Sequence, residues 1–287
     1  MSTVITEGVL VGVDGSPAAS RAVEFAAREA RARGLPLTIC HVRIPSVAPD
    51  LAPALADEAV ALAVVDDARD LAAKIAPDVT IVLATRFGVA AAELLALARR
   101  ADQIVLGARG HGGFASLLLG SVSDQVATHA HVPCTIVRGG ADFAAGAPVV
   151  VGVATPGEPG LAYAFDLAAL LGSPLVAVHA WNEAVYVPMF GVLPEYDTRY
   201  YARQARAMLT EATEPWRARY PDVPVDHRGS PRDAALALTK ASSGAARIVV
   251  GGARHTGMLG GLLGSTSRTV LHHAACPVTV VPRPRAG

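Results

Sequence analysis

The sequence has 287 residues with a formal net charge of zero and a pI of about 7.1. This balance argues against a nucleic-acid partner, because proteins that bind polyanions are usually strongly basic. Hydrophobic residues make up 52% of the chain, enough to bury two cores, and the length fits two domains of about 140 residues each.

No apolar run approaches the roughly 18 residues that span a membrane, because Asp66 and Asp67 interrupt the run "AVALAVV". The start of the chain lacks the pattern of a signal peptide. The three cysteines, Cys40, Cys134 and Cys276, have no CxxC spacing, as is typical of buried thiols in a reducing compartment. We therefore expect a soluble, cytoplasmic protein with no membrane partner.

Short apolar runs alternate with helical segments along the first half of the chain. Pro17 begins a predicted helix and Gly34 follows its end, the usual placement of these two residues. The elements expected here are a strand at 8–14, a helix at 17–33, a strand at 37–42, a helix at 54–75, a strand at 79–85, a helix at 89–100, a strand at 103–107, a helix at 116–130 and a strand at 134–138. This alternation predicts an α/β fold, with an open parallel five-stranded sheet and helices on both faces.

The second half repeats this order, and Pro215 is expected to kink or end its long helix. Its predicted elements are a strand at 149–154, a helix at 160–171, a strand at 175–181, a helix at 198–219, a strand at 223–228, a helix at 231–242, a strand at 247–251, a helix at 262–274 and a strand at 278–281. We expect two tandem domains, at 1–140 and 147–284, joined by a short linker.

A glycine-rich stretch occurs once in each half. "VLGARGHGGFASLLLGSVS" (105–123) is nearly repeated as "VVGGARHTGMLGGLLGSTS" (249–267). Each copy leaves the carboxyl end of a predicted strand, where open α/β sheets bind ligands. Glycines allow close approach of the backbone to an anion, and the following helix adds its positive end. The stretch therefore predicts a phosphate site, with hydroxyl donors from Ser121 and Ser123.

Two familiar phosphate motifs do not fit. A P-loop requires a lysine after its second glycine, and a dinucleotide fingerprint requires G-x-G-x-x-G after the first strand, where this chain has "GVDGSP". Instead, Gly107, Gly110, Gly120 and Ser121 follow the spacing G-x2-G-x9-G-[S/T]. With "GVDGSP", this spacing resembles the ATP-binding branch of the universal stress protein family. The resemblance covers nearly the whole chain twice, as in tandem-domain members.

The resemblance implies a Rossmann-like adenine-nucleotide fold that binds ATP, with Mg²⁺ held through the phosphates. Residues after the first strand and at the end of the second would hold the nucleoside, and the glycine-rich loop would hold the phosphates. The site residues implied for the first half are Gly12, Asp14, Val42, Gly107, Ala108, Arg109, Gly110, His111, Gly112, Gly113, Gly120, Ser121, Val122 and Ser123.

The second half departs from this pattern at two positions. Ala154 stands where the first half has Asp14, and Arg254 stands where it has Gly110. We expect one tight ATP site in the first half and a weak or structural one in the second. The second-half residues implied are Ala180, Gly251, Gly264, Ser265 and Ser267.

Several of these residues have a structural alternative. Asp14 could cap the helix that begins at Pro17, and the charges of Arg109 and His111 could simply be exposed. The histidines and cysteines of "HAHVPC" and "HHAAC" fall at helix ends, where histidine complements the dipole, and no fourth ligand is evident. We therefore expect no metal site. The apolar segment 182–196 could cover the core, act as a lid or meet a partner.

The sequence shows no catalytic motif such as GxSxG or HExxH. We expect a regulatory module in which ATP binding signals stress or energy state to another protein. The alternative is a slow ATP hydrolase or adenylyl-transferring enzyme of similar fold. The family resemblance also implies a homodimer and an intrachain pseudo-dimer, in which the last strands of the two halves pair through their exposed edges.

Overall fold

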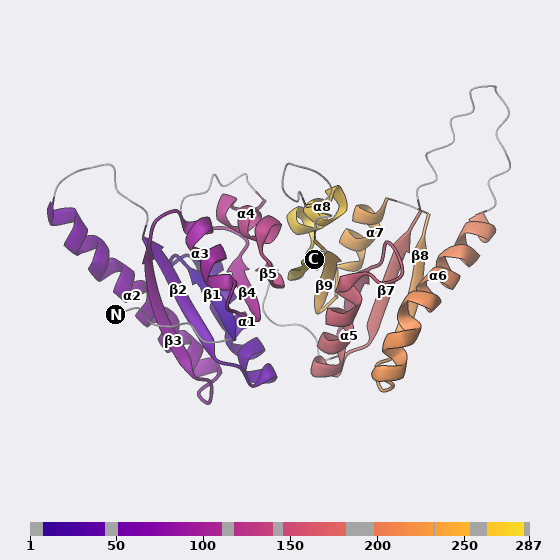
Figure 1. Cartoon of the computed structure of the whole chain (residues 1–287), viewed down its shortest axis with the longest axis horizontal. Coiled ribbons are helices and arrows are strands. Elements are labelled where there is room, and N and C mark those ends of the chain that lie inside the picture. The colour runs from indigo at the N-terminus through magenta and orange to yellow at the C-terminus, as the bar shows by residue number, and fades with distance from the viewer. Residues whose placement is uncertain are drawn as a thin grey trace, which may run out of the picture. The chain divides into compact units, whose positions relative to one another are not determined.

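The computed structural model describes seven segments of the chain, and for residues 51–57 it describes the backbone only. These segments are 8–43, 51–110, 118–139, 146–181, 198–231, 233–252 and 263–283. The chain divides into two compact units, one per half. Each unit has a parallel sheet with helices on both faces (Figure 1). The predicted fold class, two tandem α/β units, is confirmed.

The first unit contains five strands in the order β3-β2-β1-β4-β5, and every neighbouring pair is parallel. Its elements are β1 (Val9–Val13), α1 (Pro17–Arg33), β2 (Leu37–Arg43), α2 (Leu51–Ile75), β3 (Ile81–Phe87), α3 (Ala90–Ala98), β4 (Gln103–Gly107), α4 (Ser121–His129) and β5 (Cys134–Val137).

The second unit repeats this topology, with parallel strands in the order β8-β7-β6-β9-β10. Its elements are β6 (Val149–Gly152), α5 (Pro159–Leu171), β7 (Leu175–Ala180), α6 (Thr198–Arg219), β8 (Val225–Ser230), α7 (Ala234–Ala241), β9 (Arg247–Gly251), α8 (Ser265–His273) and β10 (Val278–Val281).

The central strands are buried on both faces, which explains why they are short unbroken apolar runs. Successive side chains of a strand point to opposite faces of the sheet. Val11 and Ile39 pack in the cluster that α1 and α2 cover. Gly12 points to the other face, where an added Cβ would meet Leu94 of α3 at 3.1 Å. In the second unit, Phe165 stacks near Trp216 at a ring-centroid distance of 6.4 Å.

The structure corrects several bounds of the predicted elements, of which three bear on the argument. β3 and β8 each begin and end two residues later than expected, and α4 begins at Ser121 rather than 116. The α6 helix spans Thr198–Arg219 as predicted and continues through Pro215, so this proline does not end the helix. In the described part of the chain, no helix is long and apolar enough to cross a membrane. The pairing of the two halves through β5 and β10 stays a prediction.

Ser16 is the N-cap of α1, and its hydroxyl accepts a hydrogen bond from the Ala19 N–H at 3.1 Å. The α1 helix ends at Gly34, which has φ +65°, in the left-handed region that glycine adopts without strain. The helix therefore begins at the proline and ends at the glycine, as the sequence predicts. The Ser16 hydroxyl accepts a hydrogen bond from one of the N–H groups in the first turn.

Replacing Ser16 with alanine should remove this cap and lower the free energy of unfolding by about 1 kcal/mol. Ser20→Ala is the matched control, because the Ser20 hydroxyl is exposed and donates only to the Ser16 carbonyl at 3.3 Å. Urea denaturation of both variants measures the difference. Equal stabilities for the two variants would contradict the role given to the cap.

Candidate functional site

The predicted first-half residues gather at the carboxyl edge of the first sheet. Gly107 ends β4, Asp14 directly follows β1, and Val42 is the second-to-last residue of β2. Val13 is in register with His41, so Asp14 comes level with Val42. The predicted residues His111, Gly112 and Gly113 lie outside the described part of the chain, as does segment 182–196.

Two hydrogen bonds join the ends of the glycine-rich loop. The Ser123 hydroxyl donates to the Gly107 carbonyl at 2.7 Å, and the Gly120 N–H donates to the Ala108 carbonyl at 2.8 Å. The hydroxyl hydrogen of Ser123 is thus used within the protein. Of the two predicted hydroxyl donors, the exposed Ser121 remains available to solvent.

The loop leads directly into the start of α4. Gly120 is the N-cap of this helix, and no side chain caps it. A helix leaves the N–H groups of its first turn without intrahelical acceptors, and here these groups belong to Ser121, Val122 and Ser123. The positive end of the helix dipole adds to them. The arrangement can bind an anion.

Asp14 lies against the glycine-rich loop. Its Oδ1 accepts a hydrogen bond from the Ser16 N–H at 3.0 Å, and a Cβ added to Gly110 would collide with its Oδ2. Since Ser16 caps α1, the alternative interpretation of Asp14 as that cap is wrong. The structure thus brings the predicted ribose acceptor beside the predicted phosphate-binding backbone.

Two arginines lie in or next to the glycine-rich loop. Arg109 is exposed within it, and Arg138, directly after β5, donates from Nη1 to the Leu118 carbonyl at 3.1 Å. Burial, and secondly the positive charge of Arg109, lower the pKa of the Arg138 guanidinium. Two like charges near each other favour an anion between or beside them. Arg138 is absent from the set predicted from the sequence.

A histidine occupies the same place in both units. The ring Nδ1 of His41 lies 2.8 Å from the Val13 carbonyl, and that of His179 lies 2.9 Å from the Val153 carbonyl. Each ring therefore donates from Nδ1, because a carbonyl oxygen only accepts. These bonds hold the carbonyl just before the Asp14 position. The repeated His at the end of the second strand of each half was the sequence signal for this contact.

The second unit has the same backbone contacts around its site as the first unit, here called the frame, but different side chains. The Ser267 hydroxyl donates to the carbonyl of Gly251 at 2.8 Å, as Ser123 does to Gly107. Gly264 is the uncapped N-cap of α8, which begins at Ser265. Ala180 ends β7 at the place of Val42.

An ion pair that the sequence did not reveal lies at this edge. Glu158 is 4% exposed and occupies the N-cap position of α5 without capping it. Both of its carboxylate oxygens accept from Arg283 Nη2, at 3.0 and 2.9 Å. Its carboxylate also fills the space where a Cβ of Gly251 would stand. Where the first unit has the small cap Ser16, the second therefore has a buried, paired acid beside its first loop glycine.

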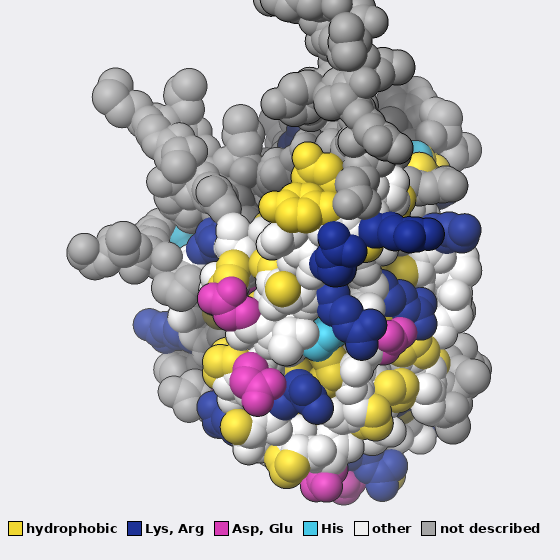
Figure 2. Space-filling model, turned by 90° about the vertical axis from the view of Figure 1, so that its right-hand side faces the viewer, with side chains coloured by type: hydrophobic (Ala, Val, Ile, Leu, Met, Phe, Trp, Pro, Cys, Tyr) yellow, Lys and Arg dark blue, Asp and Glu magenta, His cyan; other side chains and the backbone are white. Residues whose placement is uncertain are grey.

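The outer face of the second unit carries a different polar cluster. Figure 2 looks onto the side of α6 and β8 and shows dark-blue arginine or lysine side chains around a histidine. A shallow hollow of about 610 Å³ runs along α6 and is lined by Arg203, Arg206, Ala207, Thr210, Glu211 and Glu214. These residues recur at intervals of three or four positions and therefore lie on one exposed face of α6.

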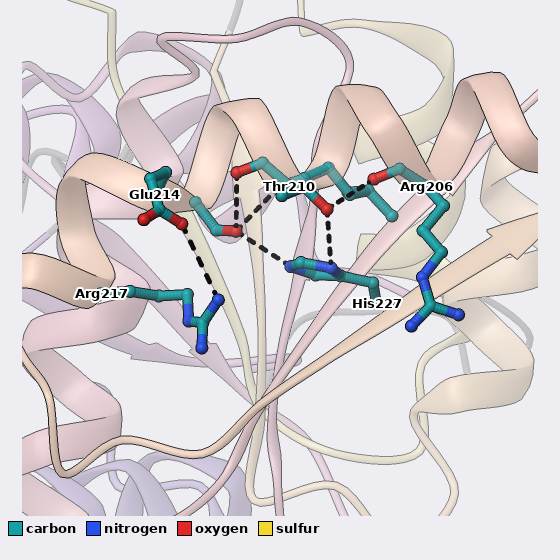
Figure 3. A network of polar contacts seen from close by, with 7 residues as sticks. Arg206, Thr210, Glu214, Arg217 and His227 are labelled. Carbon is teal, nitrogen blue, oxygen red and sulfur yellow. Dashed lines mark hydrogen bonds and ion pairs between the residues drawn. The ribbon is translucent and has the colours of Figure 1, made fainter.

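His227 of β8 lies beneath α6, between Arg206 and Arg217 (Figure 3). Its Nε2 is 2.9 Å from the Thr213 hydroxyl. Burial, followed by the charges of Arg217 and Arg206, lowers its pKa, while Asp226 opposes them. The lowered pKa favours the neutral form of His227, and its ring contacts α6 through Thr213.

The histidines near the helix ends behave as the dipole interpretation predicts. His129 is in the last turn of α4, with Nδ1 2.8 Å from the Gln125 carbonyl. Cys134 is fully buried, and burial raises its thiol pKa to about 12. Within the segments that the structure describes, no three His, Cys, Asp or Glu side chains are grouped as metal ligands.

Comparison with known proteins places the chain in a family. The sequence model of the universal stress protein family matches residues 7–138 and 148–282. A universal stress protein of Mycolicibacterium smegmatis is 34% identical over 291 residues, which is 97% of this chain and 97% of that protein. The chain belongs to the universal stress protein family and contains two of its domains.

A solved structure of a universal stress protein agrees with the fold. The crystal structure of a universal stress protein from Archaeoglobus fulgidus covers 96% of this chain and 98% of its own, with a TM-score of 0.72 and 19% identity. A universal stress protein has also been solved in complex with cAMP. It is 31% identical to this chain, covers 46% of this chain and 97% of its own, and has a TM-score of 0.39.

The lowered pKa of His227 predicts a pH effect on the second unit. In the unfolded chain the histidine titrates near pH 6.5, so the unfolded state binds the proton more readily than the folded one. The contribution of neutral His227 is complete above about pH 6.5 and is lost as the pH falls below it. His227→Gln should therefore reduce the drop in Tm between pH 7.5 and 5.5.

Arg217→Gln provides the matched test, because it removes the positive charge that lowers the His227 pKa more than Arg206 does, and it should also reduce this drop. Thermal unfolding followed by circular dichroism gives the midpoints. An identical drop in Tm for the wild type and His227→Gln would show that His227 does not titrate differently in the folded protein.

Proposed function

We propose that the first domain binds ATP at the carboxyl edge of its sheet. The phosphates lie against the loop that starts at Gly107 and against the start of α4. Asp14 accepts hydrogen bonds from the ribose, and Val42 contacts the adenine. Mg²⁺ is held through the phosphates. The proposal is supported by the uncapped helix start, the closed loop and the adjacent guanidinium of Arg109.

The observation that carries the proposal is the contact between Asp14 and Gly110. A carboxylate at a strand end suits ribose hydroxyls, as in dinucleotide-binding folds. Bare glycine backbone suits phosphate oxygens. The two groups lie side by side at the end of the sheet, as the sugar and phosphates of one nucleotide do.

The second domain is proposed to hold nucleotide weakly or not at all. It has Ala154 in place of Asp14, so the proposed hydrogen bonds to the ribose are lost. Losing hydrogen bonds of this kind typically weakens binding about 10- to 100-fold. Glu158, paired with Arg283, also fills the space beside Gly251 with a carboxylate, where the first domain has the small Ser16.

We propose a regulatory role in which ATP binding changes the shape or assembly of the chain and signals stress or energy state to another protein. Such a module retains nucleotide nearly stoichiometrically and releases little product, whereas a slow hydrolase or adenylyl transferase turns it over. The domain limits 1–140 and 147–284 and the cytoplasmic location remain predictions from the sequence, and the homodimer remains a prediction from the family resemblance.

Gly110→Arg tests the phosphate site. Its Cβ would collide with the Asp14 carboxylate, so Asp14 is displaced and the added side chain crowds the loop. We expect ATP affinity to fall by more than about 100-fold, because several charge-assisted hydrogen bonds are lost together. Isothermal titration calorimetry on nucleotide-stripped protein measures the change.

Gln125→Arg is the control, because it adds the same charge to the same domain on the exposed side of α4. Its ATP affinity should equal that of the wild type, and both variants should retain the wild-type circular dichroism spectrum. Unchanged ATP affinity in a folded Gly110→Arg protein would remove the site from the first domain.

A further inference from the structure

The strand ends of the first unit form a row, in the order β4, β1, β2, β3. Gly107 ends β4, Asp14 follows β1, and Val42 is near the end of β2. Val42 is in register with Arg86 of β3. Neighbouring strands are about 4.8 Å apart, so Arg86 lies roughly 14 Å from the β4 end and one strand beyond Val42.

Arg86 shares a face of the sheet with Val42. Residues in register on parallel strands point to the same side, and this side is the one that α3 covers, where Gly12 approaches Leu94. Burial raises the pKa of the Cys40 thiol to about 12, and the positive charge of Arg86 partly opposes this. The guanidinium therefore lies on the Cys40 and Val42 side of the strands.

The Nε atom of Arg86 is buried and, among the described residues, has no hydrogen-bond partner. Buried donors are nearly always paired in native proteins, and an unpaired one costs free energy until a partner arrives. The matching place in the second unit is Ser230, which is in register with Ala180. An arginine with an unpaired, buried Nε is thus a feature of the first unit at this position.

We propose that Arg86 holds the outer edge of the nucleotide base. This inference rests on the proposed function, because it takes the row as phosphate, ribose and base in that order. A guanidinium carries donors and no acceptor, so the partner is an acceptor atom of the base, such as a purine ring nitrogen. Arg86 fixes the base end of the crevice, whereas the glycine-rich loop fixes the phosphate end.

The test compares two ligands, ATP and inorganic triphosphate, on nucleotide-stripped full-length protein. Arg86→Ala should weaken ATP binding about 10- to 100-fold, the usual effect of losing a charged hydrogen bond. It should leave triphosphate binding unchanged, because triphosphate has no base. Arg86→Lys keeps the positive charge but replaces the planar guanidinium with a compact ammonium group. Its ATP affinity should lie between those of the wild type and Arg86→Ala.

Arg43→Ala is the matched control. Arg43 is also an arginine at this edge with a buried, unpaired Nε, but it faces the opposite side of the sheet, with its guanidinium 5.8 Å from the Phe87 ring. The Arg43→Ala protein should bind ATP with the affinity of the wild type.

Wild-type ATP affinity in Arg86→Ala overturns the inference while the proposed function stands. An equal loss of ATP and triphosphate in both Arg86 variants also overturns it, since Arg86 would then act on the phosphates. Failure of the wild-type protein to bind ATP defeats the proposed function itself, and the inference with it.

Discussion

The hydrogen bond from the Ser123 hydroxyl to the Gly107 carbonyl holds the candidate site together. It ties the first turn of α4 to the end of β4, and the Gly120–Ala108 bond closes the loop beside it. These two bonds fix the two ends of the loop. The N–H groups in the first turn of α4 lie at the same edge of the sheet as Asp14.

The same bond, from Ser267 to Gly251, is present in the second unit. The frame of the site is thus common to both halves, and the differences lie in the side chains that line it. Asp14 and Gly110 touch in the first unit, so a side chain at position 110 is compatible only with a smaller residue at position 14. The second half has that combination in its sequence, Ala154 with Arg254. The two sequence differences fit one coupled change, and under the proposed function both weaken nucleotide binding in the second domain.

Much of the fold follows from local patterns. Buried parallel strands are apolar throughout, so the segments at 103–107 and 247–251 were predicted with their observed bounds. β3 and β8 were displaced by two residues because an edge strand is half exposed, and its limits are set by pairing with its neighbour. The start of α4 was predicted too early because "SLLLG" is apolar and helix-like, whereas Gly120 ends the loop through a bond to Ala108.

The site residues could be predicted where they belong to a motif of fixed spacing. They could not be predicted where they depend on contacts between residues far apart in the sequence. The glycines and Asp14 could be found from the motif and its repeat. The pairing of Glu158 with Arg283, which are 125 positions apart, has no local pattern. Arg86 became visible only through the register of β3 with β2 and the burial of its Nε. The hydroxyl of Ser123 was assigned to the ligand because sequence cannot show which acceptor a hydroxyl reaches.

The central claim is that two similar frames give one nucleotide site. Calorimetric titration of nucleotide-stripped full-length protein with ATP measures this most directly. The account predicts about one tight site per chain, with any second site about 10- to 100-fold weaker. Two equally tight sites per chain would contradict it, because Asp14 and Gly110 would then not be the residues that decide binding.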